Sequence, residues 1–222
     1  MATRLQIRQW VRAETLVEST MMADADVNAI IDQAVNDVST RFNWPFLAAT
    51  DTIDFVADQQ AYTLPTDFHR LVAANVTGST KRLVEVAPEE YWNAYGEEPS
   101  EGDPNFFFLW GDEIFVSPVP TVSTGGLTLR YYRTATPMTD DAHTPEWDAE
   151  FHMVLADYVC RHLWHREEDF SKARVYDERY LDGIERMARF YLARAVDSPL
   201  IVGGGKSRYK SATEAWRMPW FP

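Results

Sequence analysis

The hydrophobic period of the chain changes twice, and this change restricts the fold more than any other feature. From residue 50 to about residue 136, short runs such as "TIDFVA", "RLVAANVTG" and "LTLRYYRTA" alternate in period two between turn residues, which is typical of β-strands. The segments on both sides have apolar residues at helical spacing. These patterns predict an α+β protein: amphipathic helices that form a small bundle, a β-rich inserted domain and an extended C-terminal tail.

Two helical segments are expected before the strand-rich block. The first is short and amphipathic, around residues 7–11. The second has Asp24 or Asp26 as a suitable N-cap, and it ends near Trp44 because Pro45 disfavours a helical conformation in the residue before it. Its apolar stripe comprises Val27, Ile30, Ile31, Ala34, Val35, Val38 and Phe42.

Two helical stripes are also expected after the block. Thr144 and Pro145 form a favourable helix start, because a side-chain cap is followed by a proline at the first helical position. The helical spacing then continues as far as Pro199. The first stripe comprises Phe151, Val154, Leu155, Tyr158 and Val159, and the second comprises Tyr180, Ile184, Met187 and Tyr191.

Within the strand-rich block, Gly111 and Asp112 are expected to form the tight turn of a hairpin. The arm of residues 106–110 is apolar at every position, so a strand there would be covered on both faces, by the core or by another subunit. Residues 88–104 predict a helical turn and an exposed acidic loop. The chain therefore divides into a helical domain (1–46 and 140–198), a β-rich insert (47–139) and a flexible tail (199–222).

The chain is acidic, with 34 acidic and 21 basic residues and a net charge of −13. Such a charge argues against a surface that grips a nucleic-acid backbone. The single cysteine, Cys160, excludes an intramolecular disulfide, and no apolar run approaches the roughly 20 residues of a membrane span. We expect a product without a signal peptide that is made in the cytoplasm and does not enter a membrane.

One segment resembles a phosphate-binding loop. Gly205, Lys206 and Ser207 match the end of that motif, but Leu200 stands where its first glycine belongs. Only 15 residues follow Ser207, too few for the remainder of a nucleotide-binding fold. An enzyme with a degenerate loop near Lys206 is one alternative function.

Other candidate chemistry has equally ordinary explanations. The spacing of Cys160, His162, His165 and Glu168 occurs in metal sites, and also on the exposed faces of helices. Adjacent carboxylates such as Glu89 and Glu90 are typical of a solvated acidic surface. We assign no catalytic residue, cofactor or metal ligand. A second alternative is a β-rich, glycan-binding tail component whose exposed rings are Trp92, Tyr95 and Trp110.

The segment "STRFNWPFLAATDTIDFVADQQAYTLPTDFHRLV", residues 39–72, resembles the signature of the head-to-tail connector (adaptor, or head-completion) proteins of tailed bacteriophages. In that family an amphipathic helix ends in an aromatic corner, and a strand and a Y-x-L-P-x-D-F stretch follow. The matching residues here are Arg41, Asn43, Trp44, Phe46, Tyr62, Leu64, Pro65 and Phe68.

The resemblance implies a non-enzymatic, structural component of the virion. Such adaptors form a homo-oligomeric ring, typically of twelve subunits, beneath the portal protein. The ring extends the channel for double-stranded DNA, which passes without specific binding during genome ejection, and it contacts distal tail or tail-completion proteins. We expect the protein to be synthesised in the host cytoplasm and to have no membrane partner.

The C-terminal tail is predicted to dock onto the portal. Gly203, Gly204 and Gly205 would act as a hinge. Beyond them the tail carries four basic residues and one acidic residue, opposite in sign to the remainder of the chain, so an acidic partner would attract it. The docking residues are Lys206, Arg208, Tyr209, Lys210, Trp216, Arg217, Trp220 and Phe221.

Overall fold

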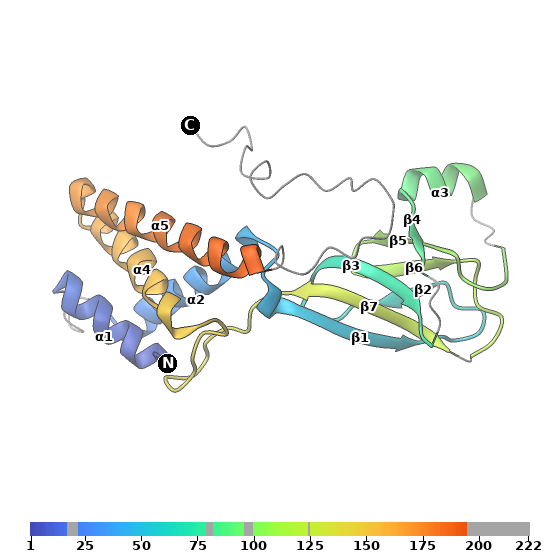
Figure 1. Ribbon diagram of the computed structural model, residues 1–222, viewed down its shortest axis with the longest axis horizontal. Coiled ribbons are helices and arrows are strands. Elements are labelled where there is room, and N and C mark those ends of the chain that lie inside the picture. The colour runs from blue at the N-terminus through green and yellow to red at the C-terminus, as the bar shows by residue number, and fades with distance from the viewer. Residues whose placement is uncertain (17–21, 79–81, 96–99, 124, 195–222) are drawn as a thin grey trace. The chain divides into compact units, whose positions relative to one another are not determined.

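The computed structural model describes residues 1–16, 22–78, 82–95, 100–123 and 125–194 (Figure 1). Contacts divide the chain into two compact units: Met1–Phe46 together with the chain from Thr136 onward, and Leu47–Ala135. The first unit is helical and the second is rich in strands, so the predicted α+β class is confirmed. The predicted tail, residues 199–222, lies outside the described residues.

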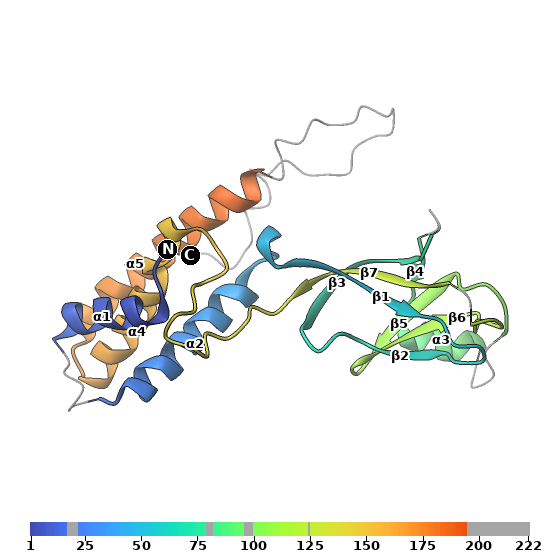
Figure 2. The same cartoon turned by 90° about the horizontal axis from the view of Figure 1, so that it is seen from below.

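Four long helices build the helical unit: α1 (Arg4–Thr15), α2 (Asp24–Arg41), α4 (Met153–Arg166) and α5 (Phe170–Arg194) (Figure 2). Helix α4 is central, because it packs against α1, α2 and α5. Gly183 of α5 allows a close approach, since a Cβ atom there would lie 2.7 Å from Cγ2 of Val154 on α4. Two short 3-10 turns, Pro45–Leu47 at the border with the β-rich unit and Ala149–Phe151 before α4, accompany them.

The apolar stripes predicted for these helices are confirmed in large part. Val27, Ile31, Ala34, Val35 and Val38 of α2 are buried, and Ile30 and Phe42 are half-buried. All five residues of the first C-terminal stripe are buried. Tyr180, Ile184 and Met187 of the second stripe are buried, while Tyr191 is half-buried.

The predicted cap of α2 is wrong. Ala23 occupies the N-cap position and makes no side-chain hydrogen bond, while Asp24 and Asp26 lie in the first turn. The carboxylate of Asp24 is used elsewhere, because it pairs with Arg8 and Arg12 of α1. The helix also ends at Arg41, three residues before Trp44.

The predicted helix start at Thr144 and Pro145 is also wrong, since α4 begins only at Met153. The preceding loop has other contacts that a helix would break. The carbonyl groups of Asp141 and His143 accept hydrogen bonds from the first-turn amides of α1. Trp147 is buried against Phe46, with ring centroids 5.8 Å apart. The local helix signal is therefore overridden by tertiary contacts.

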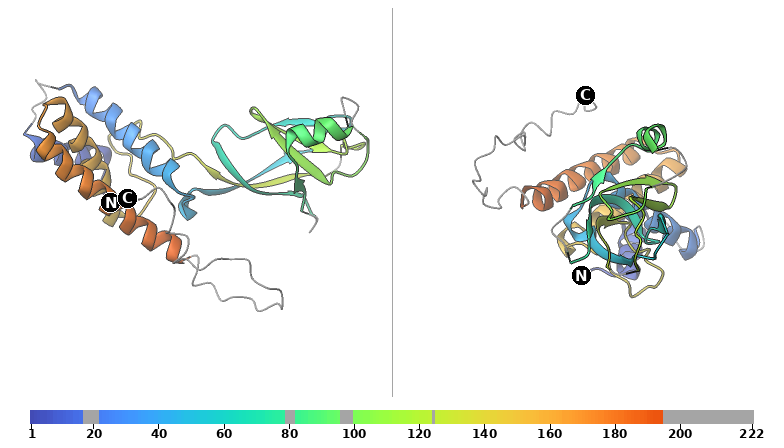
Figure 3. Two further views of the ribbon diagram at one scale, coloured as in Figure 1. Left: turned by 90° about the horizontal axis from the view of Figure 1, so that it is seen from above. Right: turned by 90° about the vertical axis from the view of Figure 1, so that its right-hand side faces the viewer.

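Two sheets build the β-rich unit (Figure 3). One has the order β1-β7-β3, formed by Ala48–Asp54, Gly126–Arg133 and Phe68–Val76, and is antiparallel throughout. The other has the order β2-β6-β5-β4, formed by Ala61–Thr63, Glu113–Ser117, Phe106–Trp110 and Val84–Glu85. Their inner faces share one core, which includes Phe55, Tyr62, Leu83, Phe107, Ile114, Leu127 and Leu129.

The hairpin at Gly111 and Asp112 is confirmed. Trp110 of β5 pairs with Glu113 of β6, and Gly111 adopts a φ of 61°, the left-handed region that favours glycine. Strand β5 is covered on both faces as predicted, because Phe107 belongs to the shared core while Phe108 packs against Tyr91 of α3 (Pro88–Tyr95).

Candidate functional site

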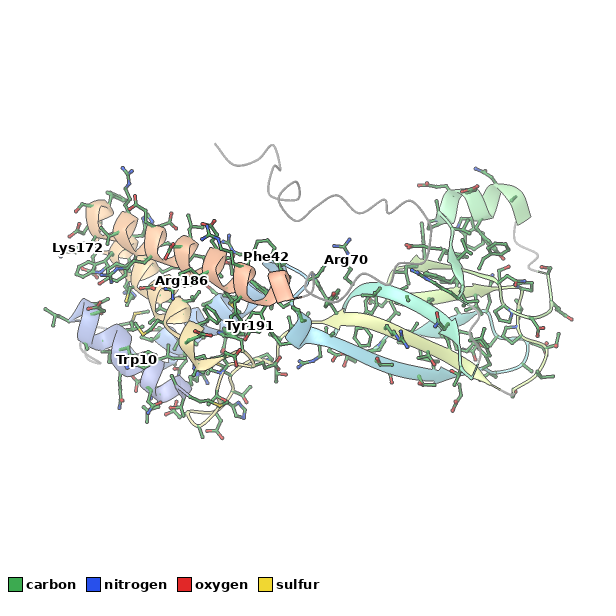
Figure 4. The ribbon with its side chains drawn as sticks, viewed as in Figure 1. Trp10, Phe42, Arg70, Lys172, Arg186 and Tyr191 are labelled. Carbon is green, nitrogen blue, oxygen red and sulfur yellow. The ribbon has the colours of Figure 1, made fainter. Side chains whose placement is uncertain are left out.

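The aromatic part of the family-like motif forms a corner at the end of α2. Trp44 is fully buried, and its indole N–H donates to the carbonyl of Val38 at 2.6 Å. Its ring stacks on Phe46 at 5.6 Å and meets Tyr191 of α5 edge-on at 6.1 Å. Figure 4 shows the labelled Phe42 and Tyr191 beside this corner. The motif thus joins the end of α2 to the end of α5.

Arg41 continues the corner into a polar network. Its guanidinium pairs with Asp37 at 2.7 Å and lies over the ring of Tyr180, 5.1 Å from the centroid. The hydroxyl of Tyr180 donates to the same carboxylate. Burial would raise the pKa of Asp37, but these two donors outweigh it and lower that pKa below its usual value. Asn43, two residues after Arg41 in the chain, is half-buried.

The remaining motif residues lie in the β-rich unit, where they also stabilise the fold. The hydroxyl of buried Tyr62 contacts the backbone of Val56 and Gln59. Leu64 is buried, and the carbonyl of Pro65 accepts from the amide of Phe68. The ring of Phe68 packs 5.6 Å from that of Tyr131. None of these contacts resembles an exposed binding site.

Helix α1 turns its arginines inward, a feature that the sequence analysis missed. Arg8 is 7% exposed, and it binds Asp141 through two hydrogen bonds of 3.0 Å. Arg4 pairs with Asp32 at 3.2 Å, and Arg12 pairs with Asp24. The sequence does contain a signal for this arrangement, because arginine recurs at positions 4, 8 and 12 and this spacing places all three on one helical face.

The N-terminus is held by His152, which the sequence analysis also missed. This histidine is fully buried; its Nδ1 accepts from the amide of Ala2, and its Nε2 lies 3.0 Å from the carbonyl of Trp147. Burial lowers the pKa of His152, so the ring is neutral near neutral pH.

The candidate metal residues do not converge. Cys160 is buried on the core side of α4, and burial raises its pKa to about 12, so its thiol stays protonated. His162 packs against Tyr158, and His165 packs against Phe170. Among the described residues, no three His, Cys, Asp or Glu side chains gather as metal ligands would.

The aromatic candidates of the β-rich unit differ in exposure. Trp110, at the end of β5, is 59% exposed. Trp92 of α3 is partly covered, because its ring meets Phe108 edge-on at 5.5 Å. Tyr95, the third ring of the glycan-binding alternative, ends α3, and its side chain lies outside the described set.

The predicted hinge, Gly203 to Gly205, and every predicted docking residue from Lys206 to Phe221 lie outside the described residues. Their role therefore stays a prediction. Among the described helices, none combines the length and apolarity that a membrane crossing requires.

A family model matches most of the chain. The model of the family described as SU10 adaptor protein matches residues 3–203, which covers both units. The curated proteins contain no match to the chain.

Proposed function

We propose, because the chain belongs to the SU10 adaptor protein family, that this phage structural adaptor joins the portal to the tail and extends the DNA channel between them. The family match across residues 3–203 is the observation that carries the proposal. As a virion component, the chain interacts with other head or tail proteins. We propose that it does so without catalysis, as a ring of identical subunits.

The motif residues support a structural role in a specific way. Trp44, Phe46 and Arg41 hold the end of α2 against α5, and Tyr62 and Phe68 stabilise the β-rich unit. A motif used in this way maintains two firmly folded units for assembly. Catalytic motifs instead direct reactive groups into a pocket.

The charge of the chain supports a channel that does not retain DNA. With 34 acidic and 21 basic residues, a ring of copies would present many carboxylates. Most described arginines of the helical unit are also paired with carboxylates, as Arg8 and Arg161 illustrate. Few fixed cations of the helical unit are then left to bind phosphate, which favours sliding of DNA past that unit.

We assign docking on the portal to the tail. The basic residues from Lys206 to Arg217 would attract an acidic surface, and Trp216, Trp220 and Phe221 would supply apolar anchors. Full burial of each ring contributes about 1.5–3 kcal/mol before the cost of ordering. Repetition around a ring turns weak single contacts into high avidity.

Binding of the full chain to purified portal tests this assignment. The full chain and a chain truncated after Val202 would be compared by co-sedimentation with portal, and we expect the truncation to abolish binding. A matched control keeps all the tail's cations and replaces only Trp216, Trp220 and Phe221 by Ala. Equal binding by the full and truncated chains would contradict docking through the tail.

The nucleotide alternative has its own test. We expect no nucleotide binding by the full chain in equilibrium dialysis. Binding that disappears on Lys206→Ala would support a phosphate-binding loop and would overturn the non-enzymatic assignment.

A further inference from the structure

Helix α1 has an outward face on which Glu14 is the one exposed charged residue. The exposed positions Leu5, Gln6, Gln9, Trp10 and Ala13 are all uncharged, although a quarter of the chain's residues are charged. Glu14, the exposed acidic residue of α1, pairs with Arg179 of α5. A solvated helix normally directs its charged residues outward, so this face has the character of a contact surface.

The inward arginines explain how this face arises. Arg4 and Arg8 are buried and pair with Asp32 and Asp141, so these cations of the helix form ion pairs on its inward side. Its outward side is left with Trp10, whose side chain is 37% exposed. Trp10 is the largest side chain on that face.

A hollow of about 360 Å³ lies at the C-terminal end of α1, where that helix meets α4 and α5. It is lined by Glu14, Leu16, Trp164, Lys172, Val175, Tyr176 and Arg179. Figure 4 labels Trp10 and Lys172, and they lie well apart on the helical unit. Helical side chains lean toward the N-terminus of their helix, so Trp10 leans away from this hollow at the C-terminal end of α1.

The walls of the hollow suit an uncharged aromatic ring. The ammonium of Lys172 lies 3.9 Å from the ring centroid of Trp164, and the guanidinium of Arg179 lies 5.2 Å from that of Tyr176. These cations are neutralised by Asp169 and Glu14. The apolar lining is also open, since Leu16 is 82% exposed.

We infer that the hollow receives Trp10 of a second copy of this chain. Copies with a net charge of −13 repel one another, so they approach most easily where neither surface carries net charge. Both the α1 face and the hollow meet that condition. The basic tail, with Arg217 beside Trp216, fits a neutral hollow less well.

This contact joins two different surfaces, so it repeats from head to tail, as the contacts within a ring must. The inference rests on the proposed ring and assigns the residues that hold neighbouring subunits together.

Disulfide trapping in the assembled complex tests the contact. Two full-length variants, Trp10→Cys and Val175→Cys, would be mixed with portal and oxidised. The native Cys160 is buried, so it does not compete. We expect a disulfide between the two different variants. The matched control pairs Trp10→Cys with Gln33→Cys, an exposed position of α2, and should give none.

A second variant measures the strength of the contact. Trp10→Ala should raise the chain concentration that is needed for half-maximal assembly on portal by about tenfold or more, as loss of an aromatic anchor does. Trp10→Phe should restore most of the assembly. Circular dichroism would verify that both variants keep the helical content of the wild type.

The outcomes distinguish failure of the Trp10 contact from failure of the proposed function. A ring on the portal without the Trp10–Val175 disulfide would overturn the inference and leave the proposed function intact. Trapping of Val175→Cys by Trp216→Cys would also overturn it, because the tail would then occupy the hollow. Failure to form any ring would refute the ring itself.

Discussion

Replacement of Trp44 tests whether the aromatic corner stabilises the helical unit. Its indole is fully buried among Phe42, Phe46 and Tyr191, with ring centroids 5.2–6.1 Å away. Removal of a buried tryptophan costs about 3–5 kcal/mol, and this site has ring partners on several sides. We expect Trp44→Ala to lower the free energy of unfolding of the helical unit by about 4 kcal/mol.

Trp44→Phe distinguishes the contribution of aromatic packing from that of the indole hydrogen bond. The phenyl ring keeps most of the aromatic packing, but it cannot donate to the carbonyl of Val38. A net hydrogen bond contributes about 1 kcal/mol, and the smaller ring leaves some volume unfilled. The expected loss is about 1–2 kcal/mol. Trp110→Ala is the matched control, because this exposed tryptophan should cost only about 0.5 kcal/mol.

Urea unfolding followed by far-ultraviolet circular dichroism provides the measurement, because the helical signal comes mainly from the helical unit. The two units require separate transitions in the fit. If Trp44→Ala cost no more than Trp110→Ala, the corner would not stabilise the fold, and the motif residues would have to serve contacts with partners.

Three further predictions concern α4 and its neighbours. Gly183→Ala should destabilise the helical unit by about 1–2 kcal/mol in the same urea assay, because the clash with Val154 outweighs the better helix propensity of alanine. Wild-type stability should fall as the pH drops below 6.5, since unfolded His152 takes up a proton more readily than the buried ring; His152→Asn should remove that component. Burial raises the pKa of Asp157 from 3.8 to about 6, so its contribution to stability declines as the pH rises through that window. Asp157→Asn should therefore stabilise the protein by about 1–2 kcal/mol at pH 7.5 and have little effect at pH 3.5.

The elements that could be predicted are those set by local patterns. The stripe from Val27 to Val38 specifies its helix because one face must be buried. Gly111 specifies the β5–β6 turn because it adopts positive φ without steric cost. The confirmed two-sided strand at residues 106–110 follows from its uninterrupted apolar run.

The errors arise where distant residues compete for the same groups. Asp24 does not cap α2, because two arginines from α1 engage its carboxylate. Thr144 does not begin a helix, because carbonyls of the same loop accept from the first turn of α1 and because Trp147 enters the core. These partners are more than 100 residues apart in the chain, or on separate helices, so no local pattern reveals them.

The candidate contact surfaces were predictable only in part. The hydrophobicity of Trp10 was visible in the sequence, but its outward direction depends on the inward ion pairs of Arg4 and Arg8. The hollow near Lys172 is assembled from three helices and leaves no local signal. The docking residues from Lys206 to Phe221 were proposed from sequence alone and lie beyond the described part of the chain.

Electron microscopy of the full chain mixed with its portal tests the central claim most directly. The account predicts a closed ring of copies of this chain bound coaxially to the portal, with an axial channel wide enough for duplex DNA. A portal that stays bare at saturating chain concentration, or scattered single copies on its outer surface, would contradict the account.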